Sequence, residues 1–304
     1  MVDHTHWAIS HLRLLSPLLL TLAVGIAKDK YDLGSTFFPI QRWKLSDVIL
    51  VQILIFLIQY TNTKLISNGI ITLAEAYIYG ALFLYLVIAA SVYGIIRIKY
   101  RLTISALGIH FRGSVGNILL GLKTWSIFEL FFFLLPLIIG KHELIYNRAQ
   151  KSIVLIVSDI PGHQVALYIL GAVVLAPIVE ESLFRGFIYS PFRRRIGHKS
   201  TAVLSSLIWS LGHYDVGFSG GLVVLGIIFI YLYAKTGSLL PSIVVHAGIS
   251  FTGLLIFLYL IAYQRNSIFI ETKGFIMWGA FFFLAASIVL FIISRQKHQK
   301  RTSG

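Results

Sequence analysis

The stretch that decides the fold is Val165-Ala-Leu-Tyr-Ile-Leu-Gly-Ala-Val-Val-Leu-Ala-Pro-Ile-Val179, which ends on Glu180 and Glu181. Arg185 follows one helical turn later. The apolar run suits the interior of a bilayer, where an ionisable side chain costs roughly 2.5–3.5 kcal/mol at the centre. Such groups face a protein interior or a wet cavity and usually have a function there. The cluster therefore predicts a functional site inside a membrane-embedded helix.

Composition extends this interpretation to the whole chain. Of its 304 residues, 57% are hydrophobic and 12% are charged, whereas an ordinary soluble domain carries about 25% charged residues. We therefore predict an all-α polytopic membrane protein. Its spans are each near the ~20 residues that cross the hydrocarbon. The eight predicted spans are 47–66, 70–96, 115–139, 163–184, 200–214, 220–235, 239–263 and 275–294.

A further apolar stretch at 14–27 is short and is interrupted by Pro17. We predict an interfacial helix there, and a signal-like segment or a ninth span are the alternatives. The spans divide the chain into five predicted parts. These are an N-terminal cytoplasmic or interfacial segment at 1–46, accessory spans at 47–139, a loop at 140–162, core helices at 163–263, and a last span with a basic tail at 264–304.

The net charge of +14 indicates how the chain is oriented in the membrane and does not indicate nucleic-acid binding. Basic residues cluster at span ends, within 97–112, 193–199 and 295–301. The eight-span topology puts all three clusters on one side, which the positive-inside rule makes cytoplasmic, together with both termini. The charge also attracts anionic lipid, so the bilayer is an expected partner and nucleic acid is not. With no targeting or retention signal, we expect a multi-pass protein of a prokaryotic plasma membrane.

Few side chains are left to carry chemistry. The chain has no cysteine, which excludes disulfides, thiolate metal sites and cysteine nucleophiles. Six histidines and glutamates fall inside apolar helical stretches: Glu75, Glu129, Glu180, Glu181, His213 and His246. The structural alternative is an ion-pair cluster of Glu180, Glu181 and Arg185 that packs one span against another, with the histidines as packing residues. For Glu129 we expect a buried hydrogen-bonding role.

A hairpin is expected to bring two of these residues to the same depth. Its turn is near Gly197, with Glu180 17 residues before it and His213 16 residues after it. Each residue of a helix rises ~1.5 Å, so these two side chains are expected to face each other. His246 comes soon after the next turn, near Lys235, and reaches the same level only if its helix is tilted or extends into the cytosol.

Three segments resemble the motifs of one family. Glu180-Glu181-Ser-Leu-Phe-Arg185 resembles the EExxxR motif of the CPBP family, the CAAX-prenyl-protease and bacteriocin-processing intramembrane endopeptidases, also called Abi. Trp209-Ser-Leu-Gly-His213 resembles its FxxxH motif, with Trp for Phe. His246-Ala-Gly-Ile-Ser250 resembles its third motif, with Ser for Asn or Asp. The resemblance covers roughly residues 163–255.

The resemblance implies hydrolysis of a peptide bond inside the membrane. It implies that Glu180 is the general base on a water, that His213 shares this water or holds a metal, and that His246 with Ser250 stabilises the oxyanion. Arg185 is most simply the counter-ion of Glu181, four residues back on the same face. The implied substrates are membrane-associated: a CAAX-type prenylated protein, or a leader or bacteriocin peptide.

The metal and the activity itself stay open. Glu180, His213 and His246 make a zinc set with one open position, and a metal-free mechanism is the alternative. Trp209 for Phe is an aromatic exchange at a packing position. Ser250 has a shorter reach than Asn, which keeps a non-catalytic bacteriocin self-immunity or regulatory protein as the alternative. A transporter with a proton relay would need an inverted repeat, and we see none.

A serine protease of the rhomboid type is a further alternative. Gly217-Phe-Ser219-Gly220 matches the rhomboid GxSG pattern, but Ser219 stands only 27 residues before His246. Ser219 is therefore expected to lie in a plain turn.

Overall fold

The computed structural model describes residues 4–26, 43–110, 113–140, 162–213, 219–264 and 272–302. Helices are the regular elements over these residues, and no strand occurs among them. In chain order they are α1 (His4–Ile26), α2 (Leu45–Ser67), α3 (Leu73–Glu75), η1 (Ala76–Gly80), α4 (Ala81–Gly94), η2 (Ile95–Lys99), η3 (Ile104–Leu107), α5 (Ser114–Ile138), α8 (Gly162–Ile169), η5 (Leu170–Leu175), α9 (Ala176–Glu181), η6 (Ser182–Ile188), α10 (Tyr189–Leu211), α11 (Ser219–Thr236), α12 (Leu240–Gln264) and α13 (Thr272–Thr302). Here η3 is a 3₁₀ turn, and η1, η2, η5 and η6 are π-helical.

The predicted all-α polytopic membrane fold is confirmed. Within the described residues, five helical stretches are long and apolar enough to cross a membrane: Leu45–Ser67, Leu73–Lys99, Ser114–Ile138, Gln164–Leu211 and Gly274–Ile293. Shorter apolar helices cover Leu15–Ile26, Gly220–Thr236 and Leu240–Ile256. The interfacial placement of 14–27 stays a prediction, and 141–161 of the predicted loop lie outside the described residues.

The 48-residue stretch Gln164–Leu211 holds two of the predicted spans. It is broken at Gly197, where φ is 76° and ψ is 172°. Glycine adopts this conformation without the Cβ clash that other residues meet. The turn predicted near Gly197 is therefore present, and it separates the helix that carries Glu180 from the helix that carries Trp209.

The chain forms two compact units, each built from two separate stretches. The first unit is Met1–Arg112 with Ile178–Ser242, and the second is Gly113–Pro177 with Ile243–Gly304. The predicted core at 163–263 therefore contributes helices to both units.

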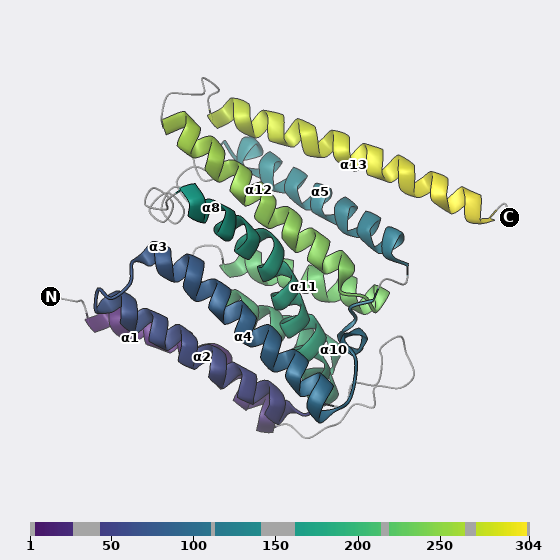
Figure 1. Cartoon of the computed structure of the whole chain (residues 1–304). Helices are drawn as coiled ribbons and strands as arrows, with labels where there is room; N and C mark the ends of the chain where they lie inside the picture. The colour runs from purple at the N-terminus through teal and green to yellow at the C-terminus, as the bar shows by residue number, and fades with distance from the viewer. Residues whose placement is uncertain are drawn as a thin grey trace. The chain divides into compact units, whose positions relative to one another are not determined.

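In the first unit, α1 packs against α2 and α10, and α2 packs against α4, which lies beside it in Figure 1. The segment before α2 is fixed by Trp43, which is fully buried. Its ring stacks on Phe187 with centroids 5.5 Å apart, and its Nε1 donates to the Phe187 carbonyl at 2.7 Å. Arg194 in turn donates to the Trp43 carbonyl at 2.7 Å. These contacts attach the start of α2 to η6, the turn that carries Arg185.

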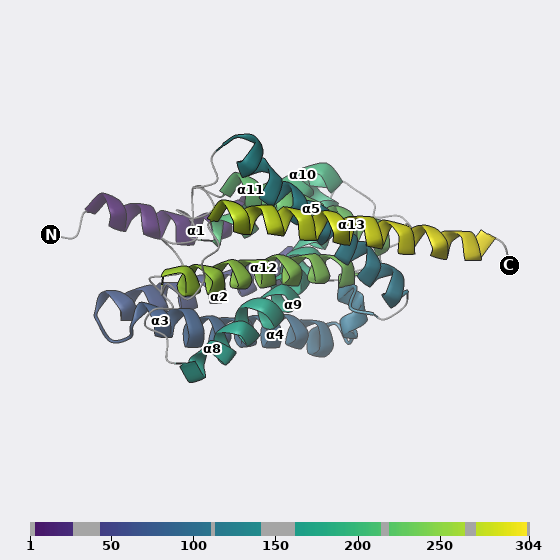
Figure 2. The same cartoon turned by 90° about the horizontal axis from the view of Figure 1, so that it is seen from above.

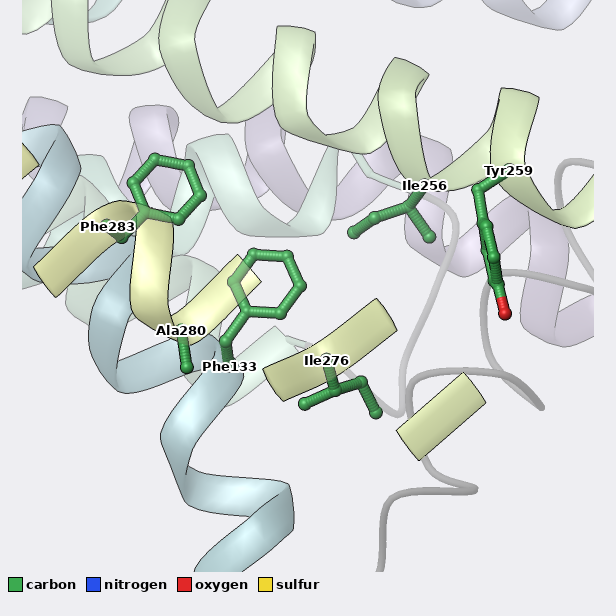
Figure 3. Close-up of a cluster of buried hydrophobic side chains, with 6 residues drawn as sticks. All are labelled: Phe133, Ile256, Tyr259, Ile276, Ala280 and Phe283. Atoms are coloured by element: carbon green, nitrogen blue, oxygen red, sulfur yellow. The ribbon is translucent and has the colours of Figure 1, made fainter. Parts of the chain in front are cut away.

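In the second unit, α13 runs alongside α5 in both views (Figures 1 and 2). Phe133 of α5 lies in a buried cluster between α12 and α13, and its ring stacks on Phe283 at 5.7 Å (Figure 3). The other members are Ile256 and Tyr259 of α12 and Ile276 and Ala280 of α13. A Cβ on Gly279 would fall 2.7 Å from the Phe133 ring, so this glycine lets α13 approach α5 closely. Phe131 and Phe281 are 67% and 64% exposed, as lipid-facing rings should be.

Candidate active site

The second half of α10 returns along η6 after the break at Gly197. Ser205 Oγ donates to the Phe184 carbonyl at 3.4 Å, and one turn later Trp209 Nε1 donates to Glu180 Oε2 at 2.6 Å. The predicted hairpin therefore brings the first and second motifs together. From this part of α10, Trp209 donates to the Glu180 carboxylate, whereas the sequence predicted that His213 would face it.

His213 lies immediately beyond Trp209. Its Nδ1 is 3.0 Å from the Trp209 carbonyl oxygen, and its ring is 4.8 Å from the indole, edge to face. A carbonyl only accepts hydrogen bonds, so Nδ1 carries the proton in this contact. In a neutral imidazole this leaves Nε2 as an acceptor, the form that suits a water or a metal.

Glu180 is half-buried and its two oxygens are held by different helices. Oε2 accepts from Trp209, and Oε1 accepts from the hydroxyl of Tyr85 at 3.0 Å. Tyr85 lies on α4, 95 residues before Glu180. Tyr85 could not be predicted from the sequence, because no motif surrounds it and a single sequence carries no signal for so distant a contact.

Glu181 and Arg185 form an ion pair with both side chains 0% exposed. Arg185 Nη1 donates to Glu181 Oε1 at 3.0 Å, and Nη2 donates to the Gly226 carbonyl of α11 at 3.4 Å. The guanidinium also lies 4.9 Å from the ring centroids of both Trp209 and Phe229. The counter-ion predicted for Glu181 is therefore in place, and it touches the indole that holds Glu180.

Close packing of α11 permits this arrangement. A Cβ on Gly226 would fall 2.7 Å from both side-chain atoms of Ser206 on α10. Only a residue without a side chain lets the two helices meet there, as small residues do at many membrane helix contacts. This approach brings the Gly226 carbonyl within reach of Arg185.

His246 and Ser250 belong to the second unit, where they lie one turn apart on α12. The opposite face of α12 packs on α5: a Cβ on Gly248 would fall 2.5 Å from the Trp125 ring, and Trp125 Nε1 donates to Thr252 Oγ1 at 3.3 Å. At about 100° per residue, Gly248 and Thr252 lie about 200° and about 240° around the helix from His246. The His246 face is therefore turned away from α5.

Glu129 of α5 lies at the contact between α5 and α12. Its side chain is 2% exposed and lies beside Thr252 and Trp125, so it is buried as expected. Among the other predicted residues, Glu180, Glu181, Arg185, Trp209 and His213 meet within the first unit. That His246 and Ser250 complete one site with them stays a prediction. Ser219 opens α11, and its side chain lies outside the described residues.

Of the predicted zinc ligands, Glu180 and His213 belong to the first unit and His246 belongs to the second. A catalytic zinc site takes three protein ligands, and Glu180 with His213 provides two. Over the part of the chain that the structure describes, no three His, Cys, Asp or Glu side chains form a group that could hold a metal ion.

Comparisons with known proteins point to the same part of the chain. Residues 162–252 match the family model described as Type II CAAX prenyl endopeptidase Rce1-like. The UPF0177 protein YxdF of Lactococcus lactis subsp. lactis (strain IL1403) is 27% identical over 150 residues, which is 43% of this chain and 79% of that protein. No solved structure matches the chain. The matched segment contains all three predicted motifs.

Proposed function

We propose a reaction for this chain from one premise, that the chain belongs to the CPBP family of intramembrane endopeptidases, which includes the CAAX-type proteases. The proposed reaction is hydrolysis of a peptide bond in a membrane-associated substrate. One observation supports it above the others: the Glu180 carboxylate is held at both oxygens, beside a fully buried ion pair, in an apolar helix. A carboxylate fixed in this way inside a membrane protein is typical of a functional site.

In the proposed mechanism Glu180 is the general base. It takes a proton from a water as the water oxygen bonds to the carbonyl carbon of the substrate. His213 accepts a hydrogen bond from the same water through Nε2, because its Nδ1 faces the Trp209 carbonyl. The carbonyl oxygen becomes an oxyanion, which His246 and Ser250 stabilise as donors. The C–N bond then breaks, and the amine leaves with the proton that Glu180 had taken.

Zinc dependence is a separate part of the proposal. Glu180, His213 and His246 would be its ligands, and the metal would polarise the carbonyl or activate the water. Two of these ligands belong to the first unit and His246 to the second, and the steps given for Glu180 and His213 use the side chains alone.

The substrate class follows from the family and the membrane. We propose a peptide segment at the bilayer surface, either a CAAX-type prenylated C-terminus or a leader or bacteriocin peptide. We also propose a prokaryotic plasma membrane, with both termini and the opening of the site on the cytoplasmic side, because the basic clusters favour that side.

The reaction is tested with the full chain in liposomes and a panel of prenylated and leader peptides in H₂¹⁸O. The expected product carries one ¹⁸O atom in its new carboxyl group, as mass spectrometry would show, because the oxygen comes from water. A parallel reaction with a chelator separates a metal-dependent enzyme from a metal-free one. Cleavage without label would contradict hydrolysis. Binding of a peptide with no cleavage of any would favour a self-immunity or regulatory protein.

Ser250 decides how well the proposed oxyanion is stabilised. Loss of one such donor costs about 10²–10³-fold in kcat, so we expect Ser250→Ala to lower kcat by at least ~10-fold if Ser250 donates directly. Ser250→Asn restores the longer donor of the family motif and is expected to raise kcat. Ser67→Ala, at the exposed end of α2, is the control. An unchanged kcat in both Ser250 variants would remove Ser250 from the mechanism.

A further inference from the structure

We infer that Tyr85 and Trp209 are positioning residues that hold the Glu180 carboxylate for proton transfer. The inference rests on the proposed function and deepens it. Tyr85 donates to one carboxylate oxygen at 3.0 Å and Trp209 donates to the other at 2.6 Å. Tyr85 comes from α4, outside the matched segment 162–252, so neither the motifs nor the family match assigns it a role.

Trp209 donates a hydrogen bond that a phenylalanine at this position could not donate. The FxxxH motif that this segment resembles has Phe here, and a phenyl ring has no donor. The indole keeps an aromatic packing surface and adds an N–H, which reaches Glu180. The exchange, expected to affect packing alone, thus adds a hydrogen bond to the proposed base.

The Trp209 indole is held in place by packing contacts that do not involve the Glu180 carboxylate. Trp209 is 2% exposed, and its ring lies edge to face with Phe229 at 5.7 Å. The Arg185 guanidinium lies 4.9 Å from the indole centroid, a favourable cation–π distance. Glu181 holds Arg185, and Arg185 holds the indole of Trp209. This indole in turn orients the Glu180 carboxylate.

Two donors, one on each oxygen, fix the plane of the carboxylate. A carboxylate offers about four lone-pair positions, so these two bonds do not fill it, and a water can still be bound. Proton transfer requires the base and the water within hydrogen-bond distance in one geometry, and a misplacement of ~1 Å can cost about 10²-fold in rate. Loss of either donor should therefore lower kcat more than it changes KM.

The alternative is that these bonds only tie α4 and α10 to α9. Tyr85→Phe and Trp209→Phe separate the two cases, because each keeps the ring and removes one donor. The matched controls are Tyr79→Phe and Trp278→Phe, whose parent residues are 46% and 66% exposed. For the positioning role we expect each of Tyr85→Phe and Trp209→Phe to lower kcat by about 10-fold with KM little changed, whereas a purely structural bond would lower Tm and leave kcat unchanged. An unchanged kcat would overturn the role.

Indole N–H resonances in a ¹⁵N–¹H spectrum give a readout independent of cleavage. The Trp209 signal is identified by its loss in Trp209→Phe. We expect it to be shifted downfield by the charged acceptor, and to move upfield in Glu180→Gln, because a neutral acceptor is weaker. A signal that does not move would overturn the inference even in an active enzyme. A signal that moves in a protein that cleaves no substrate would leave the hydrogen bond standing and sink the hydrolytic function.

Discussion

Glu180→Gln is expected to lower the rate of cleavage by about 10³-fold, the middle of the range for loss of a general base. The amide has nearly the shape of the carboxylate, and its oxygen can still accept from Tyr85 or from Trp209, so the helices should stay in place. Its nitrogen cannot take a proton from water, which removes the proposed base. The measurement is kcat/KM for a peptide that the wild-type protein cleaves in the liposome assay.

Glu75→Gln is the matched control. Glu75 is also a glutamate of a membrane helix, but its carboxylate accepts from the backbone N–H and the hydroxyl of Thr72 at the start of α3, and an amide oxygen can do the same. We expect its kcat/KM to stay within about two-fold of the wild type, as for a surface substitution. If Glu180→Gln kept full activity or a full immunity phenotype, Glu180 would not be a base and the non-catalytic alternative would gain.

The sequence was sufficient for the features that depend on local spacing. Long apolar runs located the spans, because the bilayer permits few backbone conformations. Gly197 marked the turn through its position between two runs, and the four-residue spacing marked the pair of Glu181 and Arg185. In each case the signal lies within a few residues of the feature.

The sequence could not show contacts that depend on the exact direction of a side chain around its helix, or on segments far apart in the chain. The motif continues into η6, a π-helical turn, where the hydrogen bonds skip one residue more than in an α-helix. Side-chain directions computed at 3.6 residues per turn drift there, and the structure puts Trp209 at the carboxylate that His213 was predicted to face. Tyr85 joins the site through packing of α4, which no local pattern records.

Arg185→Ala is expected to have the largest effect on stability. Removal of one partner from a fully buried ion pair typically costs 3–5 kcal/mol, because the other charge stays in the interior without its partner. Arg185 also donates to the Gly226 carbonyl and lies 4.9 Å from the ring centroids of both Trp209 and Phe229, and these contacts are lost as well. Thermal unfolding in detergent should show a drop in Tm on the order of 10 °C.

Two further variants separate the charge from the packing. Arg195→Ala removes a partly exposed guanidinium that donates to the Gly25 carbonyl, so its effect should stay below about 1 kcal/mol. Glu181→Leu combined with Arg185→Met replaces both charges by apolar side chains and should recover most of the Tm, since a buried pair and a well-packed apolar pair are often equally stable. Activity should not recover with it, because Trp209 still lacks the guanidinium that orients its indole. If Tm were unchanged in Arg185→Ala, the ion pair would not be an element of stability, and recovery of full activity in the double variant would show that Glu180 is positioned without Arg185.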